Sequence, residues 1–215
     1  MGLAQPSYDE ADRERLFDAI WDDDVAVVRS MIDKRGFPIF WYKVRSGHFT
    51  ALHLAMSRSW GALEVLLDHP NADPELRCDT GRKDWQRSST PLHSAVEHDY
   101  YEAVKLLLDH GADPDTESAA GHTSLHVAVL FASPLIVHTL LEAGANPNAE
   151  RDYKGRTPLH DTVLETQDEY VLLTLLEDAD TDPNVKDDDG RTALSHAREV
   201  GVARLVELLQ DHGGQ

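Results

Sequence analysis

A four-residue motif recurs along the chain and fixes its period. The motif begins at residues 50, 90, 123, 157 and 192, so consecutive copies are 40, 33, 34 and 35 residues apart. The five copies are Thr50-Ala-Leu-His53, Thr90-Pro-Leu-His93, Thr123-Ser-Leu-His126, Thr157-Pro-Leu-His160 and Thr192-Ala-Leu-Ser195. Each is followed by an apolar segment that ends in a Leu-Leu pair. Repetition at this period indicates stacked units that bury their apolar faces against one another.

Each unit reads as a pair of helices. The threonine suits an N-cap, because its hydroxyl can accept a hydrogen bond from an unpaired backbone N–H. Pro91 and Pro158 stand at the first helical position, where a missing N–H costs nothing. Gly111 and Gly144 suit a helix C-terminus that needs a positive φ. Small side chains that allow close helix approach recur at Ala55, Ala95, Ala128, Thr162 and Ala197.

These motifs resemble those of the ankyrin repeat family. A turn with Asp or Asn before Pro follows four of the units, as at Gly111-Ala-Asp-Pro114 and Gly144-Ala-Asn-Pro147. The resemblance implies an all-α fold, an ankyrin-repeat solenoid of antiparallel helix pairs with β-turn or finger loops. It also implies that the motif histidines form hydrogen bonds that tie neighbouring turns together.

The sequence predicts a single solenoid domain. Residues 9–36 lack the motif, but their apolar residues are spaced as in a pair of helices. The last unit has Ser195 in place of the motif histidine. We therefore expect polar-faced caps at both ends. The predicted boundaries are a flexible N-terminus 1–8, a domain 9–215, an N-terminal cap 9–36, repeats 37–75, 76–114, 115–147 and 148–183, and a C-terminal cap repeat 184–215.

The chain departs from the repeat in four ways that bear on its function. Residues 37–49 form a long aromatic connector in place of a short polar finger, and an insertion lies within residues 76–89. Asp161 stands where the family has an apolar residue, and its unit has one extra residue before the Leu-Leu pair.

Composition excludes several classes of function. The 215 residues hold 39 acidic and 20 basic side chains, a formal net charge of −19. Phosphate backbones and anionic membranes need basic contacts, so we expect neither a nucleic acid nor a membrane partner. The one cysteine, Cys78, allows no internal disulfide, which favours a reducing compartment. We expect a cytoplasmic protein, with the nucleus as the alternative.

No motif in the sequence points to catalysis, a cofactor or a metal. Glycine-rich phosphate loops, a nucleophile elbow and a His-Glu-x-x-His pair are absent. Four of the 12 histidines belong to the repeated motif. We therefore predict a protein that is not an enzyme and that needs no cofactor and no metal.

The family resemblance implies partner contacts along the concave face. The implied positions just past the small residue are Ser57 and Arg58, Glu97 and His98, Leu130 and Phe131, and Glu165 and Thr166. The finger positions before each threonine add Phe49, Ser89, His122, Arg156 and Arg191.

Aromatic and cationic side chains refine this set, since interface anchors are enriched in Trp, Tyr and Arg. The predicted contacts are Trp41, Tyr42, Phe49, Arg58, Trp85, Arg87, His98 and Phe131. Two alternatives stay open. Phe40, Trp41 and Tyr42 could form a local core over the capping helices, and Phe131 could pack between helices.

Charge is uneven along the chain. Residues 1–100 hold 17 acidic and 12 basic side chains, a net −5, while residues 101–215 hold 22 and 8, a net −14. We therefore expect a protein or peptide partner with uneven charge that binds in a fixed direction.

The sequence predicts a monomeric interaction scaffold or adaptor that binds a partner on its concave surface. An alternative is a small-molecule binder or enzyme that uses an aromatic and histidine pocket near residues 37–98. A self-assembling protein, in which inserted fingers pair two copies, is the third possibility.

Overall fold

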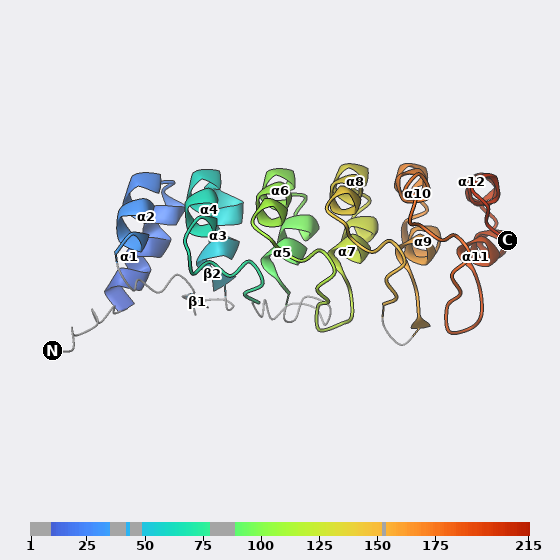
Figure 1. Cartoon of the computed structure of the whole chain (residues 1–215), viewed down its shortest axis with the longest axis horizontal. Helices are drawn as coiled ribbons and strands as arrows, with labels where there is room; N and C mark the ends of the chain where they lie inside the picture. The colour runs from blue at the N-terminus through green and yellow to red at the C-terminus, as the bar shows by residue number, and fades with distance from the viewer. Residues whose placement is uncertain (1–9, 35–41, 44–48, 78–88, 152–153) are drawn as a thin grey trace.

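A computed structural model describes residues 10–34, 42–43, 49–77, 89–151 and 154–215. Within these residues, the chain forms six helix pairs in a row (Figure 1). The first helix of each pair, here the inner helix, is α1 Glu10–Trp21, α3 Ala51–Arg58, α5 Pro91–Glu97, α7 Ser124–Leu130, α9 Pro158–Asp161 continued by the π-helical turn η3 Thr162–Thr166, and α11 Ala193–Val200. The second, outer helices are α2 Val25–Ile32, α4 Trp60–Leu67, α6 Tyr101–Asp109, α8 Pro134–Glu142, α10 Glu169–Leu176 and α12 Ala203–Asp211.

The pairs stack as the sequence predicts. Each inner helix packs against the next inner helix, and each outer helix against the next outer helix. The described parts of the loops that enter α7, α9 and α11 project together to one side, as the fingers of the predicted fold do (Figure 1). In the first finger, β1 Tyr42–Lys43 pairs antiparallel with β2 Phe49–Thr50 in the register Tyr42 to Thr50. The all-α ankyrin-type solenoid is therefore confirmed, with one short β-ladder in a finger.

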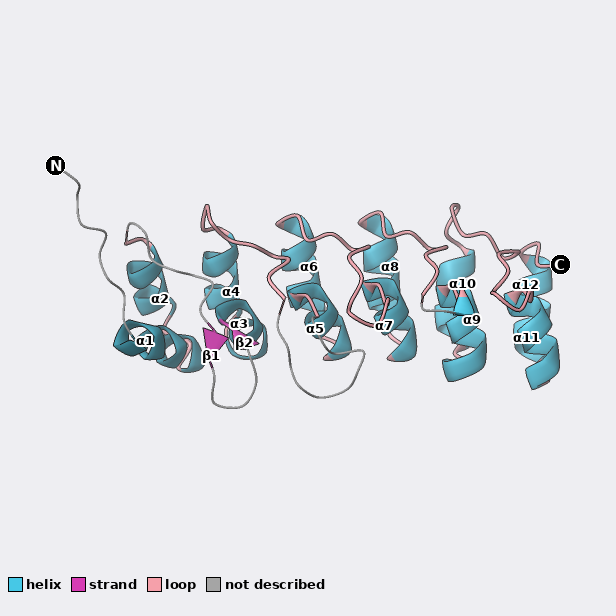
Figure 2. Ribbon diagram, turned by 90° about the horizontal axis from the view of Figure 1, so that it is seen from below, coloured by secondary structure: helices cyan, strands magenta, loops and turns pink. Residues whose placement is uncertain are grey.

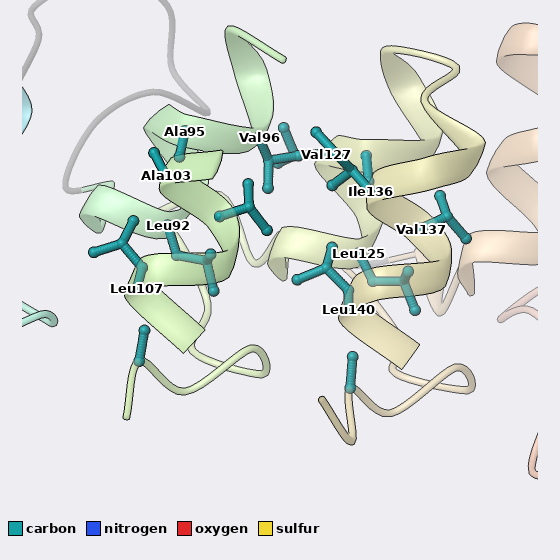
Figure 3. Close-up of a cluster of buried hydrophobic side chains, with 14 of the residues drawn as sticks. Leu92, Ala95, Val96, Ala103, Leu107, Leu125, Val127, Ile136, Val137 and Leu140 are labelled. Atoms are coloured by element: carbon teal, nitrogen blue, oxygen red, sulfur yellow. The ribbon is translucent and has the colours of Figure 1, made fainter. Parts of the chain in front are cut away.

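The core runs through the stack between the two layers of helices. The motif leucines Leu52, Leu92, Leu125, Leu159 and Leu194 are all buried. Figure 3 shows Leu92 and Leu107 of one pair beside Leu125 and Leu140 of the next. The small residue five positions after each threonine is fully buried in every unit, where a larger side chain would hold the helices apart.

The motif threonine and histidine cap their helix and bind the next finger. The Thr90 hydroxyl accepts a hydrogen bond from the His93 backbone N–H, and the His93 imidazole contacts the same hydroxyl. The other ring nitrogen, Nε2, lies 2.8 Å from the carbonyl oxygen of His122, 29 residues ahead. His126 and His160 reach the carbonyls of Arg156 and Arg191 in the same way. The predicted role is confirmed for His93, His126 and His160.

A second ladder joins the loops that leave the outer helices. The backbone N–H of Asp113 donates to Glu75, that of Asn146 to Asp115, and that of Asp182 to Asn148, at 2.8–3.0 Å. Each bond runs from one unit to the preceding one, so the units are tied on two sides of the core.

Two units differ from the others in length at the turn between their helices. Asp23, Asp99, Ala132 and Gln167 have φ near +50 to +57°, and Gly201 has φ +80°. The α3–α4 turn lacks this left-handed residue, and Ser59 ends α3 and caps α4 at once. The extra residue in the fourth repeat is absorbed by η3, in which the Gln167 N–H donates to the Thr162 carbonyl five residues back.

Candidate functional site

The C-terminal ends of the inner helices carry a row of exposed side chains. We define this inner-helix row as the residues eight positions after each threonine, namely Arg58, His98, Phe131, Glu165 and Val200. All five are exposed, although the motif leucines of the same helices are buried. The row therefore presents a cation, an imidazole, a phenyl ring, a carboxylate and an isopropyl group along one face.

Aromatic neighbours order the first part of this row. The Arg58 guanidinium carbon lies 3.6 Å from the centroid of the Trp21 ring, a cation–π contact between two neighbouring units. The His98 ring stacks on Tyr100 at 5.4 Å, and Tyr100 meets Trp60 edge to face at 6.1 Å. These contacts hold the side chains in place before any partner arrives.

The structure describes only part of the predicted contact set. Arg58 and His98 are exposed, and Phe131 keeps 45% of its surface exposed while its backbone ends α7. Trp41, Trp85 and Arg87 lie outside the described residues, and Tyr42 and Phe49 are described only through their backbone pairing. The three described contacts lie on equivalent positions of three successive units.

Two of the finger positions implied by the resemblance are buried instead of exposed. Ser89 retains 5% and His122 retains 7% of its surface. These two buried side chains therefore offer almost no surface to a partner, unlike the expectation from the resemblance. Arg156 and Arg191 are half-buried and pair with Glu165 and Glu199 of their own units.

His122 belongs to a buried polar cluster that also contains Arg151 and Asp161. Arg151 Nη2 donates to Asp161 Oδ1 at 2.8 Å, and its Nε lies 2.6 Å from Oδ2. Arg151 Nη1 lies 2.6 Å from His122 Nε2, so the cluster links two fingers to one inner helix. Burial raises the pKa of Asp161 to about 6, against the opposing effect of the Arg151 guanidinium.

A second buried cluster, in the last two units, has the residue types of a metal site. His160, Asp187 and His196 bring their donor atoms within 4.8 Å of one another. Both ring nitrogens of His160 already have protein partners, in Thr157 and in the Arg191 carbonyl. Asp187 accepts from the Arg191 backbone N–H at 2.9 Å and pairs with His196 Nε2 at 2.7 Å. This internal hydrogen bonding explains the cluster without an ion.

Further exposed apolar residues lie beside the row and were missed by sequence reasoning. Trp21, Trp60, Leu135 and Tyr170 are 44–74% exposed at the ends of their helices. The sequence could have indicated them only by their position, because each lies within three residues of the turn between the two helices of a pair. Among the helices of the described residues, none is long and apolar enough to cross a bilayer.

Comparisons with known proteins agree with this architecture. A family model of ankyrin repeats in three copies matches residues 76–151, and a model of the single ankyrin repeat matches residues 47–79. The solved ankyrin repeat domain of Bcl-3, a member of the IkappaB protein family, superposes with a TM-score of 0.81 at 26% identity, over 94% of this chain and 86% of that one. An ankyrin repeat domain from Acinetobacter baumannii gives a TM-score of 0.76 at 25% identity, over 94% of this chain and all of that one.

Curated relatives share the repeats within longer proteins. The mouse B-cell lymphoma 3 protein homolog is 37% identical over 127 residues, 58% of this chain. Human Rabankyrin-5 is 33% identical over 156 residues, 67% of this chain. The matched region spans 28% of the first protein and 13% of the second.

Proposed function

Because the chain is an ankyrin repeat protein, we propose that it is a non-enzymatic scaffold that binds another protein or peptide along its inner helices. The inner-helix row of Arg58, His98, Phe131, Glu165 and Val200 is the centre of the proposed contact surface. Trp41, Tyr42, Phe49, Trp85 and Arg87 extend that surface in the same proposal.

The observation that carries the proposal is a contrast between two sets of positions in one repeating frame. The residue two positions after each threonine is leucine in all five units and is buried each time. The residue eight positions after is different in all five units and is exposed each time. The frame is therefore constant where it packs and chemically varied where a partner can touch it.

Rigidity supports binding by this surface. The Thr–His bonds and the loop ladder fix each unit to its neighbours, and Arg58 and His98 are ordered by stacking on Trp21 and Tyr100. A surface that is already ordered loses little conformational entropy on docking, which leaves more of the contact energy as affinity. Arg58 and the aromatic rings supply side chains of the type found at binding hot spots.

Charge gives the proposed partner a direction. The net charge of residues 101–215 is −14, against −5 for residues 1–100. A partner with a basic segment would place it over the later units, and the association rate would fall as salt screens the attraction.

Affinity capture from native lysate tests the proposal. The triple variant Arg58→Ala, His98→Ala and Phe131→Ala should lose partners that the unchanged protein retains. A control variant with Arg29→Ala, Glu64→Ala and Glu142→Ala changes three exposed positions on outer helices and should retain them. Equal capture by both variants would remove the inner-helix row from the proposal.

The early fingers need their own variant. Trp85→Ala with Arg87→Ala should weaken capture while the helical circular dichroism signal stays unchanged. Unchanged capture would confine the contact surface to the inner-helix row.

A further inference from the structure

The exposed large apolar residues gather on one edge of the solenoid. Within the part of the chain that the structure describes, the exposed large hydrophobic residues are Trp21, Trp60, Phe131, Leu135, Tyr170 and Val200. Each lies where an inner helix ends or an outer helix begins. We call this side the turn edge, and these six residues the turn-edge stripe. The helices of each pair meet along this edge, on the lower side of Figure 2.

This arrangement is not an ordinary scatter of surface apolar groups. The six residues come from five of the six helix pairs, and Leu135 and Tyr170 occupy the second position of the outer helices α8 and α10. Leu135 is 55% and Tyr170 is 74% exposed. A row of exposed apolar side chains along one edge marks a candidate interaction site, because it costs free energy to leave apolar surface in water.

Acidic side chains flank the stripe. Three of the turns hold Asp22, Asp23 and Asp24; Glu97, Asp99 and Glu102; and Glu165, Asp168 and Glu169. The turn between α7 and α8 has no charged residue and carries Phe131 and Leu135. The α3–α4 turn carries Arg58, and the α11–α12 turn carries Glu199 together with Arg198 and Arg204. The edge is thus apolar at its centre and carries more acidic than basic side chains along its length, the complement of a basic amphipathic segment.

The distance between neighbouring units favours a partner segment that is an α-helix over one that is an extended strand. Packed helices lie about 8–10 Å apart, so Leu135 and Tyr170, which occupy equivalent positions on the adjacent helices α8 and α10, are separated by about that distance. Seven residues of an α-helix rise about 10.5 Å, which returns a side chain to nearly the same face. Side chains on one face of a strand recur at about 6.6 Å, which does not match.

We infer that the turn edge binds a basic amphipathic helix whose apolar side chains recur every seventh residue. The inference rests on the proposed binding function and names the class of partner for the surface that adjoins the inner-helix row. The apolar residues of the partner would cover Trp60, Phe131, Leu135 and Tyr170, and its Lys and Arg side chains would face the acidic turns.

A designed peptide tests this directly. The probe is a synthetic helical peptide of about four heptads. Each heptad carries Leu at one fixed position, a Trp or a second Leu next to it on the same face of the helix, and Lys on the two sides of that apolar face. A scrambled peptide of the same composition is the reference. By titration calorimetry, the amphipathic peptide should bind at least about tenfold more tightly than the scrambled one, a difference of about 1.4 kcal/mol.

Two variants locate the binding. Leu135→Ser with Tyr170→Ser should weaken the amphipathic peptide at least about tenfold. The matched control, Glu142→Ser with Glu177→Ser, changes exposed residues at the opposite ends of the same two outer helices and should leave affinity unchanged. Matching thermal unfolding curves for both variants would show that the fold is intact.

The outcomes separate this inference from the proposed function. Equal binding of the two peptides, or equal binding by the edge variant and its control, overturns the turn-edge site. If the triple variant of the inner-helix row still loses its captured partners, the scaffold function stands and only the partner class at the edge is wrong. If the edge variant binds the amphipathic peptide as its control does, and the triple variant keeps its captured partners, then both the turn-edge site and the proposed scaffold function are overturned.

Discussion

Asp161 is a carboxylate with no exposed surface, held by two contacts from Arg151. A buried ion pair contributes little compared with apolar packing, but leaving one member alone is expensive because the remaining charge loses its partner. The equivalent residue of the preceding repeat is the buried Val127. The cluster thus replaces apolar packing with a connection between a finger and its helix.

Substitution of Asp161 by valine should expose this dependence. With the carboxylate gone, Arg151 stays mostly buried beside His122, and we expect a loss of about 3 kcal/mol in the free energy of unfolding. The double variant Asp161→Val with Arg151→Met should recover most of that loss. Urea denaturation measures both, and a single variant as stable as the unchanged protein would contradict this assignment.

The buried histidines predict a pH dependence of stability. Burial lowers the pKa of His53 and His126 to about 3 and that of His93 to about 4. In the unfolded chain these imidazoles titrate near 6.5, so unfolding takes up three protons between about pH 4 and 6. Asp161, with its pKa raised to about 6, releases one proton on unfolding over the same window. Unfolding therefore takes up about two protons in total, three by the histidines less the one released by Asp161.

Stability should therefore fall as pH falls below about 6.5, with a slope of about 3 kcal/mol per pH unit near pH 5. Urea midpoints measured from pH 7.5 to 4.5 would give the slope. His93→Gln removes one of the protons taken up on unfolding, so it should reduce the slope by about 1.4 kcal/mol per pH unit. A urea midpoint that does not change across this pH range would show that the histidines are not buried in the neutral form.

At the scale of elements, the turns between paired helices absorb the differences among units. The sequence shows the extra residue of the fourth repeat, and the structure accommodates it as η3 within the inner helix. The choice of a π-turn depends on tertiary packing, since Val163 and Leu175 both stay fully buried around it. A count of residues locates such a difference but does not say whether a helix or a loop will absorb it.

Ala132 offers a test of turn strain. Its φ of +50° lies in the left-handed region, which costs an L-residue about 1–2 kcal/mol, whereas the equivalent Gly201 has φ +80° at no such cost. Ala132→Gly should stabilise the protein by about 0.5–1 kcal/mol after the added freedom of the unfolded chain is counted. The reverse change, Gly201→Ala, has no atoms to collide with and should destabilise it. Thermal denaturation of both variants checks the sign, and equal shifts in one direction would refute the argument.

For the whole molecule, the repeats make the fold predictable and leave the binding surface less so. The buried leucine, alanine and histidine positions follow from the period, because every unit meets the same neighbours. Arg58, His98 and Phe131 follow from the same register. Trp60, Leu135 and Tyr170 do not, because they begin outer helices that follow turns of unequal length. Their common edge appears only when the helices are placed in space.

At two finger positions, the sequence predicts exposed side chains where the structure has buried ones. Ser89 and His122 precede the motif threonines, and the resemblance places such residues in contact with a partner. Their burial arises from contacts within the stack, and for His122 from Arg151, 29 residues later. A contact at that distance along the chain carries no local sequence signal.

The central claim is that the varied, exposed ends of the inner helices form the partner-binding surface. Hydrogen–deuterium exchange of the protein with and without a captured partner tests it most directly. Binding should slow exchange at the C-terminal ends of α3, α5 and α7 and in the turns that follow them, with little change in the middle of α4, α6 and α8. Protection confined to the outer helices would contradict the claim.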